Sequence, residues 1–252
     1  MSAIKRFGLV GKNISYSFSR GYFSEKFEAL NLSNHVYQNF DLENIEEFPA
    51  VFEDFSEELL GMNVTIPYKE KVGAYLDEID EDAKEIGAIN TIKILKSGKR
   101  LGYNTDVYGF QNSIAPLIKE HHKKALILGT GGASKAVAYA FKKLNIEYKF
   151  VSRIPKNDSQ ISYESISEAL LSEFTIIVNC SPLGTSPDVH LCPDIPYEGI
   201  ANKHLLYDLI YNPAETTFLR MGKENGAVVK NGLQMLELQA EKSWEIWNEE
   251  SE

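Results

Sequence analysis

The chain has 252 residues, a length that accommodates one large domain or two of about 100 to 150 residues each. Its formal net charge of −10 argues against a nucleic-acid partner, because phosphate backbones favour a basic protein surface. Apolar residues make up 43% of the chain and no apolar run approaches the ~18 residues of a membrane span, so the composition indicates an ordinary globular protein without a membrane partner.

The first residues, MSAIKRFGLVGKN, predict a strand rather than a signal peptide, because Gly, Lys and Asn follow the short apolar run at once. Cys180 and Cys192 form no C-x-x-C pair, and a disulfide framework is not expected. The five histidines have no metal-ligand spacing, so no metal site is predicted. These features together predict a cytoplasmic protein.

The first half of the chain alternates strand and helix patterns. Helices are predicted at residues 20–30 and 44–55, where apolar residues recur at helical spacing, and Pro67 is expected to begin another. Strands are predicted at residues 4–11, 35–40, 59–66, 89–95 and 100–103. This alternation predicts an α/β domain with a mostly parallel sheet.

A second α/β unit is predicted to begin near Val107, with a Rossmann-type, doubly wound sheet. Its strands are predicted at residues 124–128, 148–152, 174–180, 205–210 and 227–230. An apolar stripe from Leu233 to Trp247 predicts a last helix that returns to the first domain. The predicted domains are therefore residues 1–106 plus 232–252, and residues 107–231.

The segment GTGGAS at residues 129–134 follows a predicted strand and opens a predicted helix, which is the setting of a dinucleotide-binding loop. Gly129 allows a tight turn, and Gly131 lets the backbone approach a pyrophosphate that faces the helix N-terminus at Gly132 and Ala133. Ser134 replaces the third glycine of G-x-G-x-x-G, so the match is incomplete and a plain strand-to-helix turn is the alternative.

The next strand indicates which dinucleotide binds. It ends at Ser152 and is followed by RIPK, without the carboxylate that binds the ribose of NAD. The planar guanidinium of Arg153 suits a 2′-phosphate, and Lys156 adds a second positive charge. We therefore expect NADP, with a solvated Arg and Lys on a loop as the alternative.

Polar stretches lie at the ends of several predicted strands of the first unit. The stretches are ISYSFS at 14–19, NVTIPYK at 63–69, GAINT at 87–91 and YNTD at 103–106. Parallel α/β sheets bind ligands beyond the carboxyl ends of their strands, so these stretches predict one site. Its hydroxyls, amides, ammonium and carboxylate suit a small polyhydroxylated acid.

At this point the chain resembles the shikimate dehydrogenases along nearly its whole length. The matching segments occur in the family's order and spacing, and they are GKNISYSFS, NVTIPYKE, GAINT, YNTD, GTGGASKA, SRIPK, NCSPLGT, YDLIYNP and NGLQMLELQA. The resemblance implies reversible, NADPH-dependent reduction of 3-dehydroshikimate to shikimate, a step towards chorismate and the aromatic amino acids. It implies that residues 1–106 plus 232–252 bind shikimate and that residues 107–231 bind NADP, in a monomer or homodimer.

The resemblance also implies roles for single residues. Lys69 and Asp106 would handle the proton at the reacting hydroxyl. The substrate's carboxylate and ring hydroxyls would be bound by Ser17, Ser19, Thr65, Asn90, Tyr211 and Gln239. The cofactor would contact Gly129, Gly131, Gly132, Ala133, Ser152, Arg153, Lys156, Ile210, Gly232 and Met235, with residues 179–185 along the nicotinamide.

The role of Lys69 stays open at this level. Burial would favour its neutral form and a neighbouring Asp106 its charged form, so the sequence does not decide between a general base and an electrostatic group. Considered without its neighbours, Lys69 would be interpreted as a solvated lysine in the first turn of a helix. Arg20 stands where the family usually has a proline, and we interpret it as a solvated side chain.

Three other functions remain open from the sequence. A quinate/shikimate dehydrogenase with relaxed substrate or NAD use is disfavoured by Arg153. A methylene-tetrahydrofolate dehydrogenase would leave ISYSFS and YNTD without a role. A non-catalytic homologue that senses shikimate or NADP would be expected to have lost Lys69 or Asp106, and the sequence keeps both.

Overall fold

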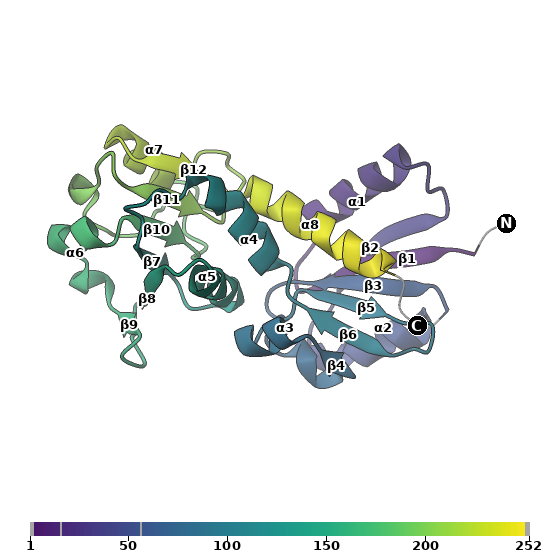
Figure 1. The fold of residues 1–252 in the computed structure, drawn as a ribbon. Coiled ribbons are helices and arrows are strands. Elements are labelled where there is room, and N and C mark those ends of the chain that lie inside the picture. The colour runs from purple at the N-terminus through teal and green to yellow at the C-terminus, as the bar shows by residue number, and fades with distance from the viewer. Residues whose placement is uncertain (1–2, 16, 56, 250–252) are drawn as a thin grey trace. The chain divides into compact units, whose positions relative to one another are not determined.

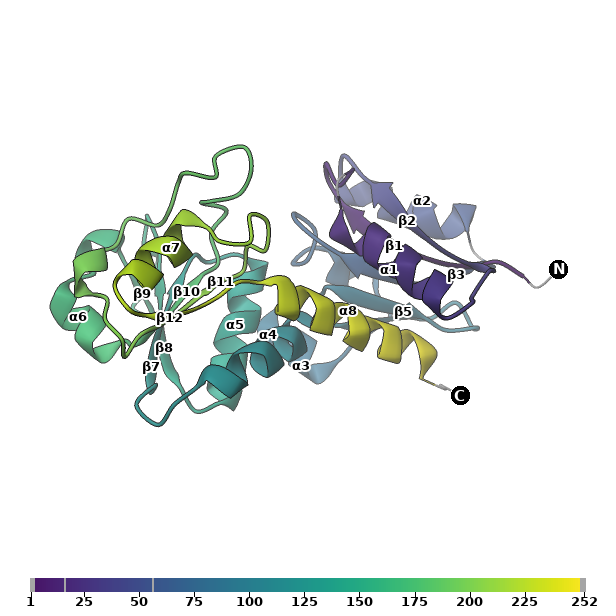
Figure 2. The ribbon, with the colours of Figure 1, turned by 90° about the horizontal axis from the view of Figure 1, so that it is seen from above.

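A computed structural model describes residues 3–15, 17–55 and 57–249 of the protein. The chain divides into two compact units, of which unit 1 is Met1–Thr105 with Ala240–Glu252 and unit 2 is Asp106–Gln239 (Figures 1 and 2). Each unit is built on its own six-stranded sheet. Within the described ranges, no helix has both the length and the apolar character needed to cross a membrane.

Unit 1 contains a mixed sheet in the order β2-β1-β3-β5-β6-β4. Strands β1, β2 and β3 are parallel, whereas β5 runs antiparallel to both β3 and β6. The strands are β1 (Lys5–Gly11), β2 (His35–Asp41), β3 (Leu59–Val64), β4 (Glu78–Ile79), β5 (Thr91–Ile94) and β6 (Arg100–Tyr103). The carboxyl ends of β1, β3 and β6 and the amino end of β5 therefore meet at one edge of this sheet.

Local sequence signals set the helix boundaries of unit 1. Helix α1 (Phe18–Ala29) begins where the Ser17 hydroxyl accepts a hydrogen bond from Arg20 N. Helix α2 (Phe48–Asp54) follows the 3₁₀ turn η1 (Ile45–Glu47). Helix α3 (Glu81–Ile86), which the sequence pattern did not reveal, is capped by the Asp80 carboxylate and ends at Gly87 with a left-handed φ of 70°.

The expectation that Pro67 begins a helix is wrong. The Ile66–Pro67 peptide bond is cis, and residues 66–71 form turns, before the short 3₁₀ helix η2 (Val72–Tyr75). The turn directs Tyr68 into the core, where its side chain is 2% exposed and its hydroxyl donates to Leu42 O at 2.6 Å. Burial of this ring and pairing of its hydroxyl explain why the chain turns here.

Unit 2 contains an all-parallel sheet in the order β12-β11-β10-β7-β8-β9. The strands are β7 (Lys124–Leu128), β8 (Glu147–Val151), β9 (Gln160–Ile161), β10 (Ile176–Asn179), β11 (Leu205–Asp208) and β12 (Val228–Lys230). The helices are α4 (Asp106–Ile114), α5 (Gly132–Lys143), α6 (Glu168–Glu173) and α7 (Thr217–Glu224), with 3₁₀ turns η3 (Ala115–Leu117), η4 (Tyr163–Ser165) and η5 (Tyr197–Gly199). The strand order reverses at β7, as expected for a doubly wound sheet.

The last helix, α8 (Leu233–Asn248), starts in unit 2, and its residues from Ala240 onward belong to unit 1. Ala240 and Trp247 pack in the same apolar cluster as Phe7 and Phe23 of unit 1. The Trp247 indole N–H donates to Ile92 O at 2.9 Å. The predicted α/β fold, with a Rossmann-type second sheet and a C-terminal helix that returns to the first domain, is confirmed.

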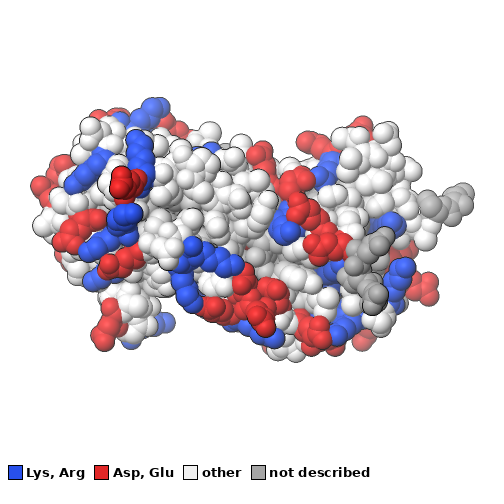
Figure 3. Space-filling model, viewed as in Figure 1, with Lys and Arg blue, Asp and Glu red and all other residues white. Residues whose placement is uncertain are grey.

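Charged side chains are dispersed over the molecular face shown in Figure 3, where Lys and Arg alternate with Asp and Glu. Several are paired locally, as in Lys124 with Glu173 and Lys223 with Glu215. Among the described residues of this face, no broad basic patch is available to an anion.

Substitution of Gly61 by alanine tests how α8 packs on unit 1. A Cβ at Gly61 would lie 2.3 Å from Trp247 Nε1, whereas a Cβ at Gly21 in α1 would have nothing within 4 Å. We expect Gly61→Ala to lower the free energy of unfolding by about 1–3 kcal/mol through overpacking. Gly21→Ala is the control and should be neutral or stabilising by up to about 1 kcal/mol. Urea denaturation measures both, and equal effects would contradict this packing.

Candidate active site at the strand ends

Three predicted site residues, the catalytic Lys69 and the substrate-binding Thr65 and Asn90, lie at the shared edge of the unit 1 sheet. Thr65 directly follows β3 and is half-buried, and its backbone N–H donates to Val10 O at 2.8 Å. Lys69 is half-buried in the turn that follows, where its carbonyl accepts from Ile89 N at 2.7 Å. Asn90 directly precedes β5 and is 2% exposed. The NVTIPYK and GAINT segments are thus brought together.

The two predicted serines lie beyond β1, at the start of α1. Ser17 is the N-cap residue of this helix and is half-buried, and Ser19 in its first turn is 9% exposed. Arg20 N–H donates to the Ser17 hydroxyl at 3.5 Å, a contact that a proline at this position could not make. The Ser17 hydroxyl can still donate its own proton to an anion near the helix N-terminus. Arg20 itself is exposed.

A buried hydrogen-bond network underlies Asn90. Its side-chain oxygen accepts from Thr105 N at 2.7 Å and from Thr91 Oγ1 at 3.1 Å, and its amide nitrogen donates to Thr105 Oγ1 at 3.0 Å. Asn63 donates to Ser243 Oγ at 2.9 Å and accepts from the Tyr37 hydroxyl at 2.9 Å. This network joins three strands to α8.

Asp106 is the first residue of α4 and is 5% exposed. Within unit 2, one turn further on, Gly109 allows α4 to lie against the first turns of α8, since a Cβ there would be 2.4 Å from Met235 O. Met235 and Gln239 are each 7% exposed on α8. Gln239 donates from its amide nitrogen to Leu236 O at 2.9 Å.

The glycine-rich loop of unit 2 fits a pyrophosphate. Gly129 has a φ of 120°, and a Cβ there would lie 3.2 Å from Cys180 O, so only glycine is free of strain. A Cβ at Gly131 would meet nothing within 4 Å, which leaves open space above this backbone. Among the described residues, no side chain caps α5, so the N–H groups of Gly132 and Ala133 at its start could donate to an anion.

Ser134 explains the missing third glycine. Its side chain is 1% exposed, and its hydroxyl donates to Gly131 O at 2.6 Å. The serine therefore fits under the loop and stabilises the turn from inside.

The loop after β8 presents two cations. Ser152 Oγ accepts from Ile154 N at 3.2 Å, which shapes the turn, and Lys156 N donates to Gln160 Oε1 at 3.0 Å. Arg153 and Lys156 are exposed, and neither forms an ion pair with any residue that the structure describes. Both side chains are therefore available to a 2′-phosphate.

Two loops beyond β10 and β11 are tied together by Asp208. This fully buried carboxylate accepts from Asn179 Nδ2 at 3.1 Å, from Ile210 N at 3.0 Å and from Thr216 Oγ1 at 2.6 Å. Asn179 Oδ1 in turn accepts from Ser181 N at 3.0 Å. Burial raises the pKa of Asp208 to about 6, although these hydrogen bonds oppose the rise.

The remaining predicted cofactor residues lie near the same loops. Gly232 N donates to Ile210 O at 3.1 Å, and a Cβ on Gly232 would be 2.1 Å from Leu209 O, so this close approach requires glycine. Tyr211, which is predicted to bind the substrate, is half-buried and follows Ile210 in the chain.

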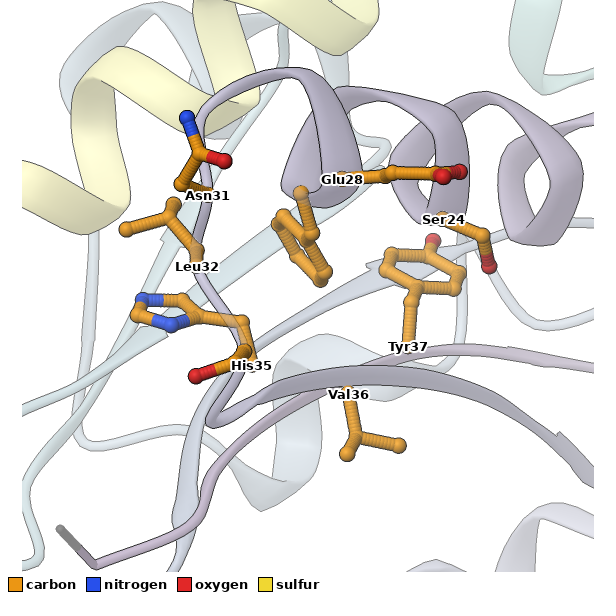
Figure 4. A pocket seen from close by; sticks show the side chains of 9 residues that line it. Ser24, Glu28, Asn31, Leu32, His35, Val36 and Tyr37 are labelled. Carbon is orange, nitrogen blue, oxygen red and sulfur yellow. The ribbon is translucent and has the colours of Figure 1, made fainter.

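Cys180 lies within the 179–185 segment predicted along the nicotinamide, whereas Cys192 and a separate hollow lie outside the predicted site residues. Cys180 and Cys192 are free thiols, and burial raises the pKa of Cys180 well above its ordinary value. No group of His, Cys, Asp or Glu in the described ranges is arranged to hold a metal ion. A hollow of about 530 Å³ between α1 and β2 is lined by residues such as Phe27, His35 and Tyr37, and by none of the predicted site residues (Figure 4).

Comparison with known proteins identifies the family to which the chain belongs. Residues 9–92 match the model of the shikimate dehydrogenase substrate binding domain. A protein of Methanococcus vannielii named shikimate dehydrogenase (NADP(+)) is 38% identical over 259 residues, covering 95% of this chain and 90% of the relative. This chain belongs to the shikimate dehydrogenase family.

Solved structures agree with this assignment. Shikimate dehydrogenase 1 from Peptoclostridium difficile is 38% identical, with a TM-score of 0.83 over 99% of this chain and 93% of the other. The Thermus thermophilus enzyme in complex with NADP(H) and shikimate is 29% identical, with a TM-score of 0.86 over 97% and 94%. The predicted family, the enzyme class of NADP-dependent oxidoreductase and the place in aromatic amino-acid biosynthesis are confirmed.

Two buried features of this chain were not predicted from the sequence, namely the hydrogen-bond network around Asn63 and the Asp208 carboxylate. Asn63 and Thr91 lie inside the quoted motifs, so an asparagine or threonine in an otherwise apolar strand was an available signal for a buried network. Ser243 had no such signal, because one serine on an amphipathic helix is ordinary. Asp208 ends a buried strand, which could have marked it as a hydrogen-bonded carboxylate.

The raised pKa of Asp208 predicts a pH-dependent stability. Because the folded pKa of about 6 exceeds the ordinary value of 3.8, the folded state retains a proton that the unfolded state has lost, and this stabilisation disappears as pH rises through 6. Asp208→Asn removes the charge, while its amide can accept from Ile210 N and donate to Thr216. We expect the variant to gain about 1–3 kcal/mol relative to wild type between pH 5 and pH 7.5.

Urea denaturation of the cofactor-free protein at both pH values measures this difference. A difference between variant and wild type that does not change with pH would contradict the raised pKa. Asp188→Asn, at an exposed position on the loop before β11, is the control and should show no such change.

Proposed function

We propose that the chain reduces 3-dehydroshikimate to shikimate reversibly, with Lys69 and Asp106 handling the proton at the reacting hydroxyl. The observation that supports this most strongly is the shared edge of the unit 1 sheet. Thr65, Lys69 and Asn90 lie there with the Thr105–Asp106 peptide, because β3 and β6 end where β5 begins. A hydroxyl-rich ring would meet hydroxyl, ammonium and amide groups at this edge.

The chemistry divides between cofactor and chain. NADPH, when bound, supplies the hydride that reduces the carbonyl carbon. Lys69 then acts in its ammonium form, because its charge stabilises the developing alkoxide and its proton completes the hydroxyl. The Asp106 carboxylate accepts a hydrogen bond from the same hydroxyl and orients it. In the reverse direction the hydroxyl proton returns to Lys69.

The other substrate groups have separate anchors. Ser17 and Ser19 bind the carboxylate at the N-terminal end of α1, where the helix dipole favours an anion, and Tyr211 lies near it. Thr65, Asn90 and Gln239 bind the ring hydroxyls. The exposed position of Arg20 supports its interpretation as a solvated side chain.

The cofactor is held by unit 2. Gly129, Gly131, Gly132 and Ala133 bind the pyrophosphate, and Ser152, Arg153 and Lys156 bind the 2′-phosphate. Ile210, Gly232 and Met235 lie beside the nicotinamide, an assignment supported by the close approach of Gly232 to the loop of Ile210.

The functional domains that we infer are residues 1–106 plus 232–252 for the substrate and residues 107–231 for NADP. This division differs from the compact units at Asp106 and at residues 232–239. These residues pack with unit 2, yet Asp106 and Gln239 are assigned to the substrate. We further infer a cytoplasmic enzyme that acts as a monomer or homodimer on small molecules.

Removal of the Lys69 amine tests the catalytic assignment. We expect Lys69→Ala to fold normally and to lose about 10²–10⁴ in kcat for shikimate oxidation with NADP⁺, because the proton-transfer group is gone. The absorbance of NADPH measures the rate. Lys71→Ala, which changes an exposed lysine two residues on, should retain wild-type kcat. Near wild-type turnover of Lys69→Ala would remove Lys69 from the mechanism, and an inactive wild-type chain would refute the function.

Substitution of Arg153 tests cofactor selection. We expect Arg153→Ala to raise KM for NADP⁺ by about 10- to 100-fold, which corresponds to the loss of a hydrogen bond between charged groups. KM for NAD⁺, which has no 2′-phosphate, should stay within about two-fold. Steady-state kinetics with both cofactors measure these KM values. An equal rise in KM for NAD⁺ would show that Arg153 does not bind the 2′-phosphate.

A further inference from the structure

Thr91 and Ser243 form a pair of completely buried hydroxyls in unit 1. Both residues are 0% exposed, and their oxygens lie 2.8 Å apart. Thr91 is the first residue of β5 and lies opposite Asn63 of β3 in the sheet register. Asn63 Nδ2 lies 3.2 Å from Thr91 Oγ1 and 2.9 Å from Ser243 Oγ, so one amide faces both hydroxyls.

This pair also contacts the residues beside the reacting groups. Thr105 Oγ1 lies 3.1 Å from Thr91 Oγ1 and 3.2 Å from Ser243 Oγ. Thr91 Oγ1 also donates to Asn90 Oδ1 at 3.1 Å. The pair is therefore connected to Asn90 directly and to Asp106 through the residue that precedes it.

The orientation of the Asn90 amide follows from these contacts. Thr105 N–H can only donate, so the atom 2.7 Å away must be the side-chain oxygen of Asn90. The hydroxyls of Thr91, Ser243 and Thr105 can then donate in a chain to Asn90 Oδ1, Thr91 Oγ1 and Ser243 Oγ. This arrangement gives the three hydroxyl protons an acceptor each and holds Thr105, the residue before Asp106, through both its backbone N–H and its hydroxyl.

We propose that Thr91 and Ser243 are positioning residues, whose hydroxyls set the orientation of Asn90 and Asp106 towards the substrate. The inference rests on the proposed function, in which Asn90 binds a ring hydroxyl and Asp106 the reacting one. Neither Thr91 nor Ser243 touches the substrate, because both are buried beneath the sheet edge.

Ser243 has a second effect through α8. It follows Gln239 by four residues, so the two side chains lie on the same face of the helix, one turn apart. The hydrogen bonds of Ser243 to Asn63 and Thr91 resist rotation of α8 about its axis.

Substitutions at Thr91 separate the effect of losing the hydroxyl from the effect of changing the shape of the side chain. Thr91→Val keeps the volume and removes the hydroxyl, whereas Thr91→Ser keeps the hydroxyl and removes the methyl. Ser243→Ala removes the other member of the pair. Ser113→Ala is a control in unit 2, since Ser113 is 2% exposed and its hydroxyl lies 2.7 Å from the Tyr207 hydroxyl, outside the network.

We expect Thr91→Val and Ser243→Ala to lower kcat/KM for shikimate by about 10- to 100-fold, because reacting groups that shift by a fraction of an ångström lose their alignment. KM for NADP⁺ should be unchanged in both. Thr91→Ser and Ser113→Ala should stay within about three-fold of wild type. The melting-temperature rise on adding shikimate alone should shrink in the first two variants, while the rise with NADP⁺ alone stays.

Other outcomes overturn the proposal. If folded Thr91→Val and Ser243→Ala keep wild-type kcat/KM, or if Thr91→Ser and Ser113→Ala lose as much, the hydroxyls do not position the substrate groups. Failure of both hydroxyl-removing variants to fold would make the network a stability element and would equally overturn it. A wild-type chain without shikimate turnover would instead contradict the proposed function.

Discussion

The buried amide of Asn63 must find hydrogen-bond partners, and the side chains that supply them lie beneath the proposed substrate site of this protein. Unpaired polar groups in a protein interior are costly, so the side chains around Asn63 are fixed in position rather than merely close. Tyr37, Thr91 and Ser243 meet this amide from β2, β5 and α8. Segments far apart in sequence thereby converge at one sheet edge.

In unit 2 a buried carboxylate connects loops in a similar way. Asp208 ties the loops after β10 and β11 to the start of α7 through three hydrogen-bond donors. A carboxylate can accept from all three donors, but its burial disfavours the charge, and this is why its pKa rises to about 6. In unit 1, neutral amides and hydroxyls connect separate segments through hydrogen bonds in the same way, without a buried charge.

Much of the fold could be predicted from the sequence, because the spacing of apolar residues distinguishes helices from strands and shows their order along the chain. The strand-end rule also placed Thr65, Lys69 and Asn90 at one edge. It did so although β5 is antiparallel, because the amino end of an antiparallel strand lies beside the carboxyl end of its neighbour. The short helix α3, with six residues, was missed since its period is too brief to recognise.

The errors and omissions have physical causes. The turn at Pro67 depends on burial of the Tyr68 ring, which is a tertiary effect that local propensity does not contain. Ser243 acquires its importance only when α8 lies against β3 and β5, a contact between distant parts of the chain. Buried polar groups of this kind are defined by their partners, and a single sequence does not show which residues those partners are.

A double-mutant cycle tests directly whether the buried hydroxyls act through Asn90. The kcat/KM for shikimate is measured for the wild type, Thr91→Val, Asn90→Ala and the double variant. If the hydroxyl of Thr91 acts by orienting the Asn90 amide, Thr91→Val should have little further effect once that amide is absent. Fully additive losses in the double variant would show that the two residues act independently and would contradict the account.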